Sequence, residues 1–169
     1  QGRYQTIYAK TPGSVAAPTA GLHFTSDLFE RLAARGIARA DLTLHVGYGT
    51  FEPVRTNQIE LHRVAEERFM IPEATVRAVN RALDEGRRVV AVGTTTTRAL
   101  EASARRGGGR LVAGAGVTDL YICPGFDFRV VGALLTNFHL PRSSLLLLVC
   151  AIAGRETVLA AYSEAVRRR

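Results

Sequence analysis

The sequence predicts an α/β fold, a three-layer α/β/α arrangement around a mostly parallel sheet. Short apolar segments of strand length alternate along the chain with longer segments of helical periodicity. The apolar segment 88–92 is followed at once by Gly93 and a helical segment, which is the order of a strand, a turn and a helix. With 169 residues, 47% hydrophobic and 22% charged, the chain can build one core, so we expect residues 1–169 to form one α/β domain of catalytic type.

The first third of the chain predicts a loop, a helix and a strand. Residues 13–24 are rich in glycine, proline and threonine, which is typical of a loop. Thr25 or Ser26 can cap the following helix, which Gly36 ends. Residues 37–46 alternate as a strand does and place His45 at its carboxyl end. The helix has an apolar face made of Leu28, Phe29 and Leu32.

The middle of the chain contains the clearest helix. Residues 51–69 have weak periodicity, and we expect mostly loop with a short strand. Pro72 suits the first position of a helix that Gly86 ends. A strand at 88–92, the turn at Gly93 and a helix at about 98–105 follow.

The last third predicts two strands and two helices. The glycines at 107–109 form a surface loop, and strands at 120–123 and 130–136 flank a turn at Pro124 and Gly125. A buried helix at 144–153 ends at Gly154, and a final helix covers 156–168.

Four short strings place histidine or threonine beside glycine or proline, and such polar groups are costly in a dry core. Three of them follow predicted strands, and ligands of α/β sheets bind at the carboxyl ends of strands. We therefore expect the strings to converge on one pocket. They are Pro18-Thr-Ala-Gly-Leu-His-Phe24, Leu44-His-Val-Gly-Tyr-Gly-Thr50, Gly93-Thr-Thr-Thr-Thr-Arg98 and Leu135-Thr-Asn-Phe-His-Leu-Pro141.

Each string also has a plain structural explanation. The Gly93 string opens a helix, whose free N–H groups attract anions and to which Arg98 adds a cation. Alternatively, one threonine only caps the helix and Arg98 pairs with Glu101. Asn137 and His139 offer an amide and a proton-transferring imidazole, or are satisfied by backbone in a turn, and the same two explanations hold for His23 and His45.

Composition narrows the function classes. The net charge of +7 comes from 21 arginines and one lysine, which attracts phosphates or reflects a genomic preference for arginine. The two cysteines fit no metal or redox spacing, the histidines have no ligand spacing, and no glycine elbow surrounds a serine. The most apolar run, 145–153, is about half of a membrane span. We expect a cytoplasmic protein without a metal.

Together the ordered strings resemble one family closely, the S-adenosylmethionine:tRNA ribosyltransferase-isomerases of queuosine biosynthesis. The resemblance also covers Thr43-Leu-His-Val-Gly-Tyr-Gly-Thr-Phe-Glu-Pro-Val54 and Arg98-Ala-Leu-Glu101. It implies an enzyme that moves the ribosyl moiety of S-adenosylmethionine to 7-aminomethyl-7-deazaguanine at the tRNA wobble position, giving epoxyqueuosine, adenine and methionine. It also implies that the chain is the portion after an inserted β-barrel domain, without the amino-terminal strands and the extreme carboxyl terminus.

The resemblance transfers positions, and residue chemistry suggests roles. The catalytic candidates, in order, are His139, His45 and His23, one of which would take a proton beside the sulfonium. We expect a monomer that takes S-adenosylmethionine as co-substrate and tRNA as partner. The predicted substrate-binding residues are Thr19, Gly21, Gly47, Gly49, Thr50, Gly93, Thr94, Thr95, Arg98, Glu101, Pro124, Gly125, Thr136, Asn137 and Phe138.

Two departures from the family pattern leave other functions open. Family members usually carry a histidine where this chain has Ala65 and an aspartate where it has Gly132. A divergent tRNA-binding relative without turnover therefore remains an alternative. A second alternative is an α/β enzyme that binds a phosphorylated metabolite at residues 93–98.

Overall fold

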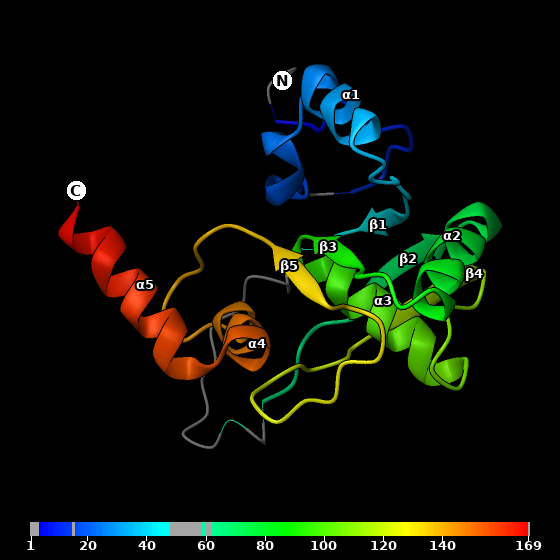
Figure 1. The fold of residues 1–169 in the computed structure, drawn as a ribbon. Coiled ribbons are helices and arrows are strands. Elements are labelled where there is room, and N and C mark those ends of the chain that lie inside the picture. Colours follow the sequence, from blue (N-terminus) through cyan, green and yellow to red (C-terminus); the bar gives the residue numbers. More distant parts are fainter. Residues whose placement is uncertain (1–3, 15, 48–58, 60–61, 169) are drawn as a thin grey trace.

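The computed structural model describes residues 4–14, 16–47, 59 and 62–168 (Figure 1). Helices and strands alternate over most of this length, so the predicted α/β class is confirmed. The elements are the 3-10 helix η1 (Thr19–His23), α1 (Ser26–Ala34), β1 (Thr43–His45), β2 (Glu67–Ile71), α2 (Glu73–Asp84), β3 (Val90–Val92), α3 (Thr94–Arg106), β4 (Gly114–Thr118), β5 (Ala133–Leu135), α4 (Ser144–Ala153) and α5 (Arg155–Arg167).

The strands form two small sheets. In the first, β2 lies between β1 and β4 and is antiparallel to both, and in the second β3 and β5 are parallel. The prediction of a mostly parallel sheet is therefore wrong for the described residues, where two of three pairings are antiparallel. The reason lies in β2, which alternates buried and exposed residues, the pattern of an antiparallel sheet with one solvated face.

The helix ends follow local side-chain chemistry. Thr25 and Ser143 cap α1 and α4, each accepting a bond from the backbone N–H three residues on. Helix α3 begins at Thr94, four residues earlier than predicted. Gly93 makes this possible because its φ of 95° turns the chain directly from β3 into the helix.

The prediction missed β4 and placed a strand at 120–123 where the structure has none. Residues 114–118 contain two glycines, which disguise a strand. Gly116 is needed there because a Cβ at this position would lie 2.4 Å from the Phe69 ring. The backbone of Leu120 is bonded to side chains and not to a neighbouring strand. Its N–H donates to the Thr118 hydroxyl, and its carbonyl accepts from Arg98.

The core lies where α2 and α3 pack on β2 and on the β3–β5 pair. It contains Phe69, Ile71, Val79, Ala91, Ala99, Leu100, Ala104, Leu111, Val130 and Val131. Helices α4 and α5 form a bent pair (Figure 1), with an angle of 115° between them, and Ile152 of α4 packs against this core. Among the described residues no single helix is long and apolar enough to cross a membrane.

Candidate functional site

A cavity of about 510 Å³ opens at the carboxyl ends of the two parallel strands. Gly93, directly after β3, donates its N–H to the Leu135 carbonyl at 2.9 Å, so the two strings that follow β3 and β5 lie side by side. The volume is within the roughly 300–1,000 Å³ typical of small-molecule sites. The lining residues are Ala17, Pro18, Thr19, Ala20, Leu44, Val46, Gly93, Thr94, Thr95, Thr96, Thr136, Asn137, Phe138, His139, Leu140, Pro141, Ser143 and Leu145.

Asn137 connects the loop after β5 to the amino-terminal segment. Its Oδ1 lies 2.7 Å from Nε2 of His23, and its Nδ2 donates to the Thr19 hydroxyl at 3.0 Å. His23 does not line the cavity itself, but it contacts a residue that does. Residues of η1 thus bond both the oxygen and the nitrogen of the Asn137 amide, which fixes the amide at the edge of the cavity.

His139 lies deeper and is held from two sides. Its Nε2 is 3.1 Å from the Thr136 hydroxyl, and its backbone N–H donates to the Tyr162 hydroxyl at 2.7 Å. Burial lowers the pKa of His139 below the usual 6.5 because desolvation disfavours the imidazolium. The ring is therefore neutral at pH 7 and can accept a proton.

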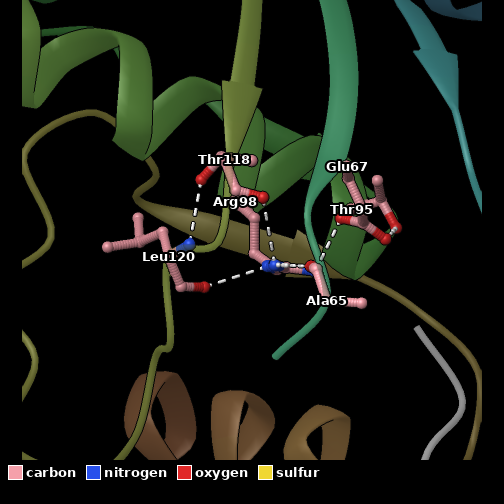
Figure 2. A network of polar contacts seen from close by, with 6 residues as sticks. All are labelled: Ala65, Glu67, Thr95, Arg98, Thr118 and Leu120. Carbon is pink, nitrogen blue, oxygen red and sulfur yellow. Dashed lines mark hydrogen bonds and ion pairs between the residues drawn. The ribbon is translucent and has the colours of Figure 1, made fainter. Parts of the chain in front are cut away.

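Arg98 does not face the cavity, which corrects the expectation that it holds an anionic group of the ligand. Its guanidinium is buried, pairs with Glu67 at 2.7 Å, and donates to the carbonyls of Ala65, Thr118 and Leu120 (Figure 2). Burial lowers the pKa of Arg98, and the neighbouring Glu67 carboxylate opposes this shift. The cation therefore fastens α3 to the ends of β2 and β4.

Glu101 is also committed to the interior, and it does not pair with Arg98. It is fully buried and accepts bonds from the N–H groups of Arg129, Val130 and Val131. The carboxylate thereby organises the chain entering β5. The predicted ligand contact at Glu101 has no support in this geometry.

Three predicted glycine and proline positions lie away from the cavity lining. Pro124 and Gly125 form a turn closed by a bond from the Phe126 N–H to the Cys123 carbonyl. Gly21 packs inside the amino-terminal segment, where a Cβ would lie 2.2 Å from the Tyr8 hydroxyl. This close packing explains why residue 21 is a glycine.

His45 faces a different hollow from His139. Leu44 and Val46 line the cavity, and because side chains alternate along a strand, His45 points to the opposite side of β1. There it lines a hollow of about 710 Å³ with Arg68, its partner across the strand pair. Gly47 lines neither hollow, and Gly49 and Thr50 lie outside the described residues.

Two residues that support the site were missed from the sequence. Tyr162 binds the His139 backbone, and its ring packs edge-on against Phe138 with centroids 4.8 Å apart. Glu67 accepts from the Thr95 hydroxyl at 3.3 Å and pairs with Arg98. Glu67 is the first residue of β2 in a segment of weak periodicity, and nothing local marked Tyr162, so neither residue had a sequence signal.

The site's donor set is one of imidazole, hydroxyl and amide groups. In the described part of the chain, no three His, Cys, Asp or Glu side chains group as metal ligands. Cys123 and Cys150 are both free thiols. The arrangement offers a polar organic molecule hydrogen-bond donors, acceptors and one neutral imidazole.

Comparison with known proteins identifies the family. A family model described as "Queuosine biosynthesis protein" matches residues 1–169. The chain belongs to this family. It is 57% identical over 169 residues to the S-adenosylmethionine:tRNA ribosyltransferase-isomerase of Syntrophotalea carbinolica, covering 100% of this chain and 49% of that relative. It is 54% identical over 167 residues to the Thermotoga maritima protein of the same name, covering 99% and 49% respectively.

A solved structure of the family matches the fold. The crystal structure of S-adenosylmethionine tRNA ribosyltransferase from Thermotoga maritima is 45% identical with a TM-score of 0.70, over 88% of this chain and 46% of that one. The chain spans about half the length of the curated relatives it matches.

The two departures from the family pattern lie outside the cavity lining. Ala65 contributes its backbone carbonyl to Arg98. Gly132 donates its N–H to the Val89 carbonyl, and a Cβ there would lie 3.1 Å from Cγ of Arg88. A side chain at Gly132 therefore requires Arg88 to shift.

Proposed function

We propose that the chain supplies the S-adenosylmethionine site of a tRNA ribosyltransferase-isomerase that forms epoxyqueuosine in tRNA. The observation that carries the proposal is the cavity where Thr94 and Thr95 meet Asn137 and His139. Family membership over the whole chain supports it. The products besides the modified tRNA are adenine and methionine.

His139 is the proposed base. A sulfonium stabilises negative charge on an adjacent carbon, so a neutral imidazole can remove a proton from that carbon. His139 is neutral at pH 7 because of its burial, and Thr136 and Tyr162 hold its ring and backbone. His23 has an indirect role through Asn137, and His45 is the weakest of the three candidates because it faces the other hollow.

The remaining cavity groups are proposed to bind the substrate. The backbone N–H groups of Thr94 and Thr95 open α3 and suit the methionine carboxylate, a role that Arg98 cannot fill. Asn137 and Thr19 offer polar edges to a base, and Phe138, which is 66% exposed, offers a ring for stacking. Thr136 and Gly93 complete the wall at the strand ends.

The larger assembly is also part of the proposal. We infer that residues 1–169 form part of a three-layer α/β/α domain that, in the family's full length, carries further strands and an inserted β-barrel. The excess of arginine suits the tRNA partner, and we infer that the enzyme is monomeric and cytoplasmic.

The test measures adenine release. The 169-residue chain, and a chimera in which it replaces the matching half of the Thermotoga maritima relative, are incubated with S-adenosylmethionine and tRNA carrying 7-aminomethyl-7-deazaguanine. The chimera should release adenine, and its His139→Gln variant should not. Binding of S-adenosylmethionine without release would favour the divergent relative that Ala65 and Gly132 suggest, and absence of binding would favour a different metabolite.

A further inference from the structure

The interior fixes the hydrogen-bonding direction of the Thr95 hydroxyl, a group of the cavity lining. Thr95 lines the cavity near the start of α3, and its Oγ1 lies 3.3 Å from Oε1 of Glu67 (Figure 2). A threonine hydroxyl carries a single hydrogen and can otherwise only accept. The direction of this one bond therefore decides what Thr95 offers to a ligand.

Glu67 can only accept at this position. It is 1% exposed, and its other oxygen, Oε2, receives a bond from Arg98 at 2.7 Å. Because arginine is always charged, the carboxylate beside it is held as the acceptor of a charge-assisted bond. Thr95 must therefore donate its hydrogen to Glu67, away from the cavity.

Arg98 keeps this arrangement rigid. Its three other bonds, to the carbonyls of Ala65, Thr118 and Leu120, hold the guanidinium between β2 and β4, so Glu67 cannot turn away from Thr95 without losing its partner. Any bond that the Thr95 hydroxyl makes with a ligand then uses its lone pairs. A carboxylate or phosphate oxygen facing this hydroxyl oxygen would be repelled, because both would present lone pairs and neither a hydrogen.

We propose that Thr95 is a specificity-determining residue whose Oγ1 accepts a hydrogen bond from a nitrogen donor of the substrate. This inference rests on the proposed function. In S-adenosylmethionine the nitrogens that only donate are the α-ammonium and the adenine amino group, whereas ribose hydroxyls can bond in either direction. The proposal assigns Thr95 to one of these two nitrogen groups, while the carboxylate is left to the backbone N–H groups of α3.

Calorimetric binding tests the inference on the 169-residue chain and on the chimera. The ligands are S-adenosylmethionine, its deamino analogue, in which hydrogen replaces the α-ammonium, and its purine analogue, in which hydrogen replaces the adenine amino group. The variants are Thr95→Val and Thr95→Ala, which lose the hydroxyl, and Thr95→Ser, which keeps it. Thr96→Val is the matched control, since Thr96 also lines the cavity without contacting Glu67 in the described hydrogen bonds.

The expected result is a loss of about 10-fold in affinity for S-adenosylmethionine in Thr95→Val and Thr95→Ala, with parental affinity in Thr95→Ser. One of the two analogues should bind parent and Thr95→Val equally, which identifies the nitrogen. Thr96→Val should discriminate among the three ligands as the parent does. Parental binding by Thr95→Val, or an equal loss for all three ligands, would overturn the inference alone, whereas no binding by the parent would overturn the proposed function as well.

Discussion

Asn137 and His23, 114 positions apart in the chain, are joined by a 2.7 Å bond between Oδ1 and Nε2. Because Thr19 accepts from the other side of the same amide, η1 is fastened to the loop after β5 at two points. This contact forms one wall of the cavity from segments that share no sheet or helix. Hydrogen bonds between side chains therefore hold this wall together, without any backbone pairing of strands between these described segments.

A double-mutant cycle tests this wall. His23→Ala and Asn137→Ala should each weaken binding of S-adenosylmethionine, and the double variant should be little worse than Asn137→Ala, since each single change removes the shared bond. Calorimetric affinities of the four proteins give the coupling. Strictly additive losses would show that the two side chains act separately.

The pH dependence of stability should reveal His139. Its pKa is lowered on folding, so below about pH 6.5 the unfolded chain binds a proton that the folded chain refuses. Stability should thus be full above that pH and fall as the pH drops toward the lowered pKa. Urea midpoints between pH 5 and 7.5 measure the slope, and His139→Gln should flatten it. An unchanged slope in this variant would contradict the burial of the ring.

His139→Gln should also separate binding from chemistry. A lost general base typically costs about 10²–10⁴-fold in turnover. Binding of S-adenosylmethionine should change far less, since glutamine keeps a polar side chain in the cavity. Adenine release by the chimera and calorimetry measure the two effects. Turnover near the parental rate would remove His139 as the base.

Arg98→Met should unfold the chain more easily rather than only weaken ligand binding. Removing one partner of a buried ion pair typically costs about 3–5 kcal/mol, because the remaining Glu67 charge is left uncompensated. Urea denaturation measures the loss. The matched control is Arg110→Met, which breaks the exposed pair with Asp84 and should leave the midpoint close to the parent's. Equal midpoints for the two variants would contradict the structural role of Arg98.

Tyr162→Phe should loosen the loop that carries His139. The variant keeps the ring that packs on Phe138 and loses only the acceptor for the His139 N–H, at a cost of about 1 kcal/mol. We expect lower kcat in the chimera with a smaller change in KM, because the base is displaced more than the substrate contacts. Tyr162→Leu, which also removes the ring contact, should be worse in both. Parental kcat and KM in Tyr162→Phe would show that the loop keeps its position without the Tyr162 hydroxyl.

Much of the fold followed from local signals, and the exceptions have physical causes. The caps at Thr25 and Ser143 act within a few residues, so the starts of α1 and α4 could be predicted, whereas α3 begins directly after Gly93, four residues before its predicted start. Strand β4 could not be predicted, because glycine at position 116 is required by its close contact with the Phe69 ring, which is distant in the sequence, and glycine has low strand propensity.

The candidate site divides in the same way. The meeting of the Gly93 and Thr136 strings followed from parallel-strand topology. The inward turn of Arg98 depended on Glu67, 31 positions away, and the outward turn of His45 on which face of β1 meets the cavity. Neither side-chain orientation can be predicted from the spacing of residues in the sequence.

A crystal structure of the chain with S-adenosylmethionine would show whether the ligand binds in the cavity beside His139. We expect the nucleoside in the 510 Å³ cavity, with a nitrogen donor on Thr95 and the carbons bonded to the sulfonium facing His139. Ligand bound instead in the hollow beside His45 and Arg68, with the cavity empty at saturating concentration, would contradict it.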